Sequence, residues 1–151
     1  MRKGDVVSDF ELPDETGTSR RLSEFLVDGP VVLFFYPAAL SLGCTMESCH
    51  FRDLIGEFKA VGAQPVGISA DRVERQRHFA EKHSLGYPLL SDSDQVVAGQ
   101  FGVRGWIPVL PLQRVTFVID TDLTVLEVIS SELVMTAHAD RALDVLKKRR
   151  R

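Results

Sequence analysis

The chain has 151 residues, of which 44% are hydrophobic and 26% are charged. This length suits one domain over residues 1–151, and the composition excludes general disorder because the chain can bury a sizeable core. The formal net charge is −3, from 18 Lys and Arg against 21 Asp and Glu, and the pI of about 5.8 argues against a nucleic-acid partner. The one basic run, 147–151, is expected to be the solvated end of a helix, where cations suit the negative pole of the helix dipole.

No segment of the sequence predicts contact with a membrane. The longest apolar run, Val31 to Tyr36, is stopped by Pro37 and is far shorter than the roughly 20 residues that cross a bilayer. The first residues, Met1 to Asp5, are not followed by the apolar stretch of a signal peptide. We therefore expect a cytoplasmic protein.

The first predicted elements are a hairpin and a strand. Residues Phe10 to Gly17 alternate in polarity and turn at Thr16-Gly17, and a second arm follows at Ser19 to Leu22, which together predict an N-terminal β-hairpin. Val31 to Tyr36 is a continuous β-branched and aromatic run, typical of a central strand that is buried on both faces.

The segment from Cys44 to Val61 predicts one amphipathic helix. Phe51, Leu54, Ile55 and Phe58 recur at i, i+3, i+4 and i+7, which places them on one face of a helix.

The later segments alternate between strand and helix patterns. They predict a strand at Pro65–Ser69, a surface helix at Asp71–His83, a strand at Tyr87–Leu90, a helix near Asp94–Phe101, a hairpin of strands at Arg114–Asp120 and Val125–Ser130, and a C-terminal helix through Ala139, Ala142, Leu143 and Leu146. This order describes an α/β protein with a mixed central sheet and helices on both faces, which is a thioredoxin-like arrangement.

Cys44 is the strongest candidate for a chemically active residue. It lies where the buried strand gives way to the long helix, beyond the carboxyl end of the strand, where open α/β sheets bind ligands. In the first helical turn, unpaired N–H groups and the helix dipole favour a thiolate. A buried and inert cysteine is the alternative.

The spacing of Cys44 and Cys49 restricts how the two thiols can react. On an ideal helix their Cα atoms lie about 8.7 Å apart, whereas a disulfide needs about 7 Å or less. A disulfide between them therefore requires the first turns to unwind, and Cys49 would attack only after Cys44 had been oxidised. An inert, packed thiol is the alternative for Cys49.

The other polar candidates give weaker signals. A metal site at Cys44, Cys49 and His50 is not expected, because residues 49 and 50 point about 100° apart on a helix and a fourth ligand is not apparent. His78, His83 and His138 are expected on solvated helix faces or caps. Trp106 is expected in a loop, as part of a pocket or as a packing anchor.

Around Cys44 the sequence resembles the peroxiredoxins. Pro37-x-x-x-Ser41-x-x-Cys44 is similar to their Pro-x-x-x-Thr/Ser-x-x-Cys signature, and residues 43–53 resemble the Q-type branch, once called bacterioferritin comigratory protein. The resemblance runs from about Lys3 to Leu146. The family more often has Thr at position 41 and Pro at position 42, where this chain has Ser41 and Leu42.

This resemblance implies a thiol peroxidase. Cys44 would attack hydrogen peroxide or an organic hydroperoxide, Cys49 would capture the sulfenate as a disulfide, and thioredoxin or a similar dithiol would reduce it. No metal, haem or flavin cofactor is implied, and a monomer is expected because the disulfide is intramolecular.

The resemblance also implies roles for other residues. Ser41 would hydrogen-bond the peroxide, Pro37 would shield the pocket from water, and Arg114 would place a cation beside the thiolate. Without the resemblance, Arg114 could equally be an exposed strand end, and Ser41 is also a favoured helix N-cap. Glu47 could orient an arginine or support the first helical turn.

Two other functions compete with this one. A thiol–disulfide oxidoreductase of thioredoxin type uses Cys-x-x-Cys, and the four residues between Cys44 and Cys49 do not fit that motif. A catalytically idle thioredoxin-like domain that binds proteins would keep its cysteines buried and unreactive.

Overall fold

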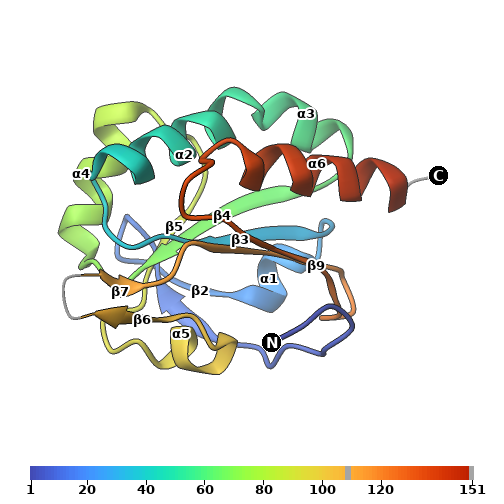
Figure 1. Ribbon diagram of the computed structural model, residues 1–151, viewed down its shortest axis with the longest axis horizontal. Helices are drawn as coiled ribbons and strands as arrows, with labels where there is room; N and C mark the ends of the chain where they lie inside the picture. Colours follow the sequence, from blue (N-terminus) through green and yellow to red (C-terminus); the bar gives the residue numbers. More distant parts are fainter. Residues whose placement is uncertain (108–109, 150–151) are drawn as a thin grey trace.

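A five-stranded mixed sheet forms the centre of the computed structural model, which describes residues 1–107 and 110–149 (Figure 1). The strand order is β5-β4-β3-β8-β9, and the strands are β3 (Val31–Phe35), β4 (Gln64–Ser69), β5 (Leu89–Ser91), β8 (Val115–Ile119) and β9 (Val125–Ser130). β3, β4 and β5 pair in parallel, whereas β8 pairs antiparallel with both β3 and β9. The predicted mixed sheet is confirmed.

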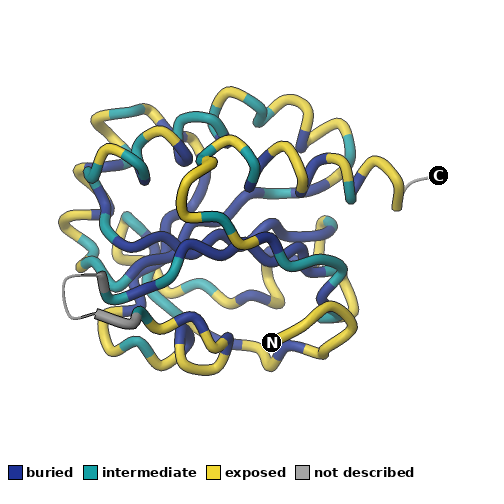
Figure 2. The backbone as a smooth tube through the Cα atoms, viewed as in Figure 1, coloured by how far each residue is buried: buried dark blue, intermediate teal, exposed yellow. Residues whose placement is uncertain are grey.

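Strand β3 is buried on both faces, as its continuous apolar sequence predicts. Val31, Leu33 and Phe35 belong to one hydrophobic core, whereas Val32 and Phe34 belong to another on the opposite face of the sheet. Figure 2 shows the sheet as the buried layer of the molecule, with exposed backbone on both outer surfaces.

Helices cover both faces of the sheet, which confirms the predicted layers. Residues of α2 (Leu42–Asp53), α3 (Ile55–Ala60), α4 (Val73–His83) and α6 (Ala137–Arg149) pack in the core that contains Phe34, and residues of α1 (Leu22–Leu26) and α5 (Val96–Phe101) pack in the other. In Figure 1, α2, α3 and α6 lie above the sheet, and α1 and α5 lie below it.

The N-terminal hairpin and the C-terminal helix also form as predicted. β1 (Glu11–Pro13) pairs antiparallel with β2 (Ser19–Arg21). In α6, the apolar positions Ala139, Ala142, Leu143 and Leu146 are all buried, and the basic residues of the last turn are exposed.

Within the described ranges, no helix is both long and apolar enough to cross a membrane.

The single long helix predicted over residues 44–61 is wrong, because the structure divides it into α2 and α3 at Leu54. Leu54 has φ −99° and ψ 10°, and its N–H bonds to the carbonyls of both His50 and Phe51. This conformation is close to helical, so the apolar period continues across the break. Phe51 and Phe58 lie on either side of it, with ring centroids 5.8 Å apart.

The sequence patterns missed three short elements. They are α1 and the two strands of a separate antiparallel ribbon, β6 (Arg104–Ile107) and β7 (Leu110–Leu112). Pro111 lies in β7 and argues against a strand, but every strand of a two-stranded ribbon is an edge strand and tolerates proline. Trp106, expected in a loop, lies in β6, and its side chain is outside the described part of the structure.

Candidate active site

Cys44 lies in the first turn of α2, which begins just beyond the carboxyl end of β3. The residue has no exposed surface. The first N–H groups of a helix lack acceptors within the helix, and they place a partial positive charge near the Cys44 side chain. The fold therefore holds this thiol in a buried site that favours negative charge.

Arg114, immediately before β8, is the cation of this site. Its Nη2 donates to Cys44 Sγ at 3.4 Å, and its Nη1 donates to Glu47 Oε1 at 2.8 Å. Burial alone would lower the pKa of Arg114, but the charges of Glu47 and Cys44 outweigh it and raise the pKa above its usual value. The guanidinium therefore stays charged between the thiol and the carboxyl group.

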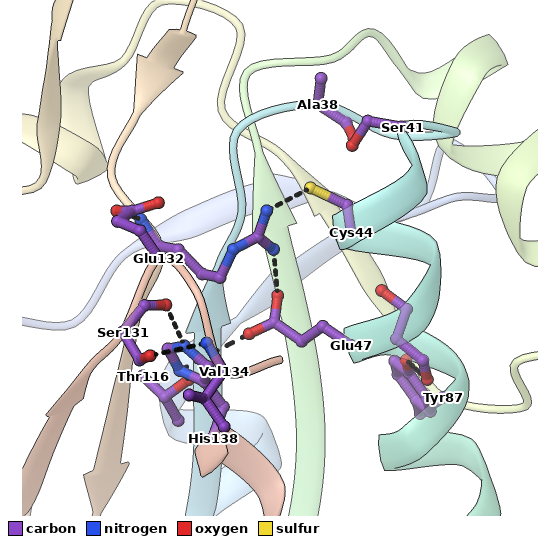
Figure 3. Close-up of polar contacts among 12 residues, drawn as sticks. Ala38, Ser41, Cys44, Glu47, Tyr87, Thr116, Ser131, Glu132, Val134 and His138 are labelled. Atoms are coloured by element: carbon purple, nitrogen blue, oxygen red, sulfur yellow. Dashed lines mark hydrogen bonds and ion pairs between the residues drawn. The ribbon is translucent and has the colours of Figure 1, made fainter. Parts of the chain in front are cut away.

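Glu47 holds the guanidinium from the side opposite Cys44. The two residues are three positions apart in α2, so their side chains lie on the same face of the helix, as Figure 3 shows. Glu47 is fully buried, and this burial raises its pKa to about 8 even though Arg114 acts in the opposite direction. Glu132, whose Oε1 accepts the backbone N–H of Arg114 at 2.9 Å, adds to the upward shift.

The raised pKa of Glu47 predicts that stability decreases with pH. The unfolded chain loses this proton near pH 4.5 and the folded chain near 8, so the free energy of unfolding should fall across that interval. Histidines and cysteines of the unfolded chain also titrate in parts of this window, so the contribution of Glu47 is the difference between the curves of the wild-type and Glu47→Gln proteins. Urea denaturation across this window measures the fall, which Glu47→Gln should flatten.

The exposed Glu57 of α3 provides the matched control. Glu57→Gln should keep the wild-type dependence on pH. An equal fall in the Glu47→Gln protein would contradict the assignment of the effect to Glu47.

The loop between β3 and α2 carries the two other expected site residues. Pro37 is buried and Ser41 is half-buried. Ser41 is at the N-cap position of α2, but its side chain makes no capping bond. The N-cap position is confirmed, but the Ser41 hydroxyl does not cap the helix and instead donates to the Ala38 carbonyl at 2.8 Å, which leaves its oxygen able to accept a hydrogen bond from a bound molecule.

Asp71, which lies between β4 and α4, and Arg75 of α4 anchor this loop. Asp71 Oδ2 accepts the Ala39 N–H at 2.7 Å and the Ser69 hydroxyl at 2.8 Å, and Arg75 donates to the Ala39 carbonyl at 3.2 Å. The next residue, Leu40, has a φ of 67°, which is strained for a residue with a side chain. Sequence reasoning missed these anchors because they are far from the loop in sequence.

Cys49 lies in the same intact helix as Cys44, and both thiols are free. Residues around Cys49 bind neighbouring segments: Tyr87 donates to the Ser48 carbonyl at 2.6 Å, His50 pairs with Asp140 at 2.7 Å, and Arg52 donates to the His83 carbonyl at 2.7 Å. Unwinding of α2 would have to overcome such contacts and would also carry Glu47 away from Arg114.

His138 is not on a solvated face, and that prediction is wrong. It is fully buried, because the face of α6 on which it lies packs against β8 and β9. His78 is exposed in α4, and His83 is half-buried against the Phe79 ring. Over residues 1–107 and 110–149, no three His, Cys, Asp or Glu side chains form a group that could hold a metal ion.

The fold and this site define the class of the protein: a thioredoxin-fold protein with a cysteine and an arginine in contact at a strand-to-helix junction. Residues 3–128 match the AhpC/TSA family. The chain is 36% identical to peroxiredoxin Bcp of Escherichia coli over 153 aligned positions, which cover 98% of this chain and 97% of that protein. The chain therefore belongs to the AhpC/TSA family, in which its relatives are peroxiredoxins.

Solved structures give the same result. The chain matches peroxidoxin BcpB of Mycobacterium tuberculosis with a TM-score of 0.94 and 60% identity, over 98% of this chain and 97% of that one. It matches the PrxQ of Xylella fastidiosa with a TM-score of 0.92 and 27% identity, over 100% and 98% of the two chains. For the bacterioferritin comigratory protein of Xanthomonas campestris, studied for its alkyl peroxide reduction activity, the TM-score is 0.85 and the identity 28%, over 94% and 92%.

Proposed function

We propose that this protein reduces hydrogen peroxide and organic hydroperoxides through the thiolate of Cys44. The observation that carries the proposal is the 3.4 Å contact between Cys44 Sγ and the Arg114 guanidinium at the start of α2. A thiolate attacks peroxides, whereas a thiol does not, and this site stabilises the anion with a permanent cation and helix N–H groups.

The first reaction step oxidises the sulfur by two electrons. Cys44 sulfur attacks the terminal peroxide oxygen, an S–O bond forms, and the O–O bond breaks. The leaving oxygen keeps the electron pair and takes up a proton to become water or an alcohol, and Cys44 becomes a sulfenic acid. Donors are needed where negative charge develops on the leaving oxygen, and Arg114 supplies them. Ser41 hydrogen-bonds the peroxide, and buried Pro37 excludes water.

The second step uses Cys49. Its sulfur attacks the Cys44 sulfenic sulfur, an S–S bond forms, and hydroxide leaves to become water. Because both cysteines lie in α2, and five residues of intact helix separate sulfurs beyond bonding reach, α2 must unwind first. A dithiol protein of thioredoxin type then reduces the disulfide. The protein works as a cytoplasmic monomer, with residues 1–151 as one domain.

Thiol counting tests this proposal and separates it from its two rivals. One equivalent of hydrogen peroxide should remove two free thiols from each reduced chain within minutes. If the number of free thiols does not change, the result would favour a catalytically idle domain that binds proteins. Activity as a disulfide reductant towards protein substrates, without peroxide consumption, would favour a thiol–disulfide oxidoreductase.

Cys49→Ser separates the two steps. We expect one rapid oxidation of Cys44, trapped as a dimedone adduct of the sulfenic acid, and recycling by thioredoxin should stop or slow by at least about tenfold because no disulfide can form. The measurement is NADPH consumption coupled through thioredoxin reductase. Unchanged steady turnover would show that Cys49 is not the resolving thiol.

A further inference from the structure

One oxygen of the buried Glu47 carboxyl group lacks a hydrogen-bond donor among the residues that the structure describes. Oε1 accepts from Arg114, whereas Oε2 has no hydrogen-bond partner in this part of the chain. Nδ1 of His138 lies 3.5 Å from this Oε2 atom. A buried carboxylate oxygen without a donor is costly, so this oxygen is best accounted for by a proton that lies between Glu47 and His138.

His138 is oriented to share that proton. Its Nε2 lies 2.8 Å from the Ser131 carbonyl, and because a carbonyl only accepts, Nε2 must carry a hydrogen. Nδ1 therefore faces Glu47 Oε2 and the Thr116 hydroxyl, which lies 2.8 Å away. The hydroxyl can either donate to Nδ1 or accept from it, so Thr116 adapts to the proton and does not determine where it lies.

These contacts connect His138 to the reacting sulfur. The contacts run from His138 through Glu47 Oε2 and Oε1 to Arg114, and from Arg114 to Cys44 Sγ. Figure 3 labels Cys44, Glu47 and His138 along this path and marks the interactions between the residues drawn with dashed lines. A negatively charged Glu47 competes with the Cys44 thiolate for the guanidinium. A Glu47–His138 pair that keeps one proton is neutral and leaves the charge of Arg114 to the sulfur.

We propose that His138 is a positioning residue of the peroxidase site, which shares one proton with Glu47 and thereby keeps the partner of Arg114 neutral while Cys44 is oxidised. This proposal rests on the proposed function. His138 itself does not touch the sulfur. Loss of the shared proton at alkaline pH turns Glu47 into a competitor and slows the reaction.

Charged groups from several elements surround this pair. Arg114 and Cys44 lie on the Oε1 side of Glu47, and Glu132, from the segment between β9 and α6, favours keeping the proton. Arg114 and Arg141 oppose a positive charge on His138, whereas Glu132 favours it. Burial lowers the pKa of His138 and raises that of Glu47. Both shifts favour a pair that holds one proton and no net charge.

The pH dependence of Cys44 oxidation tests the proposal. The wild-type rate constant, measured in a single turnover with hydrogen peroxide, should fall on the alkaline side as the pair loses its proton. His138→Leu removes the acceptor and should move this fall to lower pH by about one unit, a tenfold change in proton affinity. His138→Asn offers a carbonyl oxygen near the position of Nδ1 and should restore the fall towards its wild-type position.

The Glu47→Gln protein shows whether His138→Leu acts through the proton on Glu47 or only disturbs the structure. In Glu47→Gln, which cannot ionise, the alkaline fall should disappear, and adding His138→Leu should not bring about any further shift. An identical shift from His138→Leu in both backgrounds would overturn the proposal, as would a wild-type pH profile in the His138→Leu protein. A wild-type protein that consumes no peroxide at any pH would instead refute the proposed function.

Nitrogen NMR of the wild-type protein tests the same idea without a core substitution. With ¹⁵N-labelled histidine, Nδ1 of His138 should change its shift at the pH where the rate falls, and Glu47→Gln should remove that change. A His138 signal that stays constant through the alkaline fall would overturn the proposal.

Discussion

Replacement of Cys44 by serine should abolish peroxide reduction. A serine hydroxyl in the same place remains protonated, and its oxygen cannot accept the peroxide oxygen as sulfur does. We expect turnover to drop by at least about 10⁴-fold, to the background of the assay, as when an enzyme loses its nucleophile. Peroxide consumption in the presence of excess dithiothreitol measures it, because this reductant bypasses the need for a protein partner.

Cys49→Ser is the matched control, since it also removes one thiol from α2. With dithiothreitol as reductant it should retain peroxide consumption, because a small thiol can reduce the Cys44 sulfenic acid directly. Appreciable turnover in Cys44→Ser would exclude Cys44 as the attacking thiol and would point to Cys49 instead.

Replacement of Arg114 by alanine should slow the oxidation of Cys44 by about 10²- to 10³-fold, the usual effect of removing a donor that meets developing negative charge. The same change leaves Glu47 Oε1 without its donor in a fully buried position, so stability should also decrease. Stopped-flow oxidation at equal fractions of folded protein separates the two effects. Arg114→Lys should give an intermediate rate, because one ammonium group cannot match the two-sided contact of a guanidinium.

Arg77→Ala is the control for loss of an arginine, because Arg77 is exposed on α4 and donates to the Glu15 carbonyl at 3.1 Å. It should leave the oxidation rate unchanged. A wild-type rate in a folded Arg114→Ala protein would remove Arg114 from the reaction.

Periodic and local features of the structure could be predicted from the sequence. The apolar run of β3, the alternation of the first hairpin and the buried face of α6 all follow from the spacing of apolar residues, which reflects the period of each element. The position of Cys44 in a first helical turn depends on the strand that precedes it and the helix that follows. The break between α2 and α3 at Leu54 could not be predicted, because the helical spacing of apolar residues continues across it.

Contacts between distant segments could not be predicted in the same way. Arg114 is 70 residues from Cys44, and Asp71 is 32 residues from Ala39. His138 was expected on a solvated face, although it lies four and eight positions before the buried Ala142 and Leu146 and therefore on their side of the helix. Nothing in its local sequence shows that this turn of α6 packs over Glu47.

The sequence by itself determined the types and order of the longer elements and the candidate cysteine, because these depend on side-chain period and on neighbours along the chain. Only the tertiary structure decided which charges meet at that cysteine. The packing of the β3–α2 junction against β8 and α6 buries Arg114, Glu47 and His138 together. In a site shielded from water, the protonation state of each group depends on the charges and hydrogen bonds around it. Here those neighbouring groups come from distant parts of the chain.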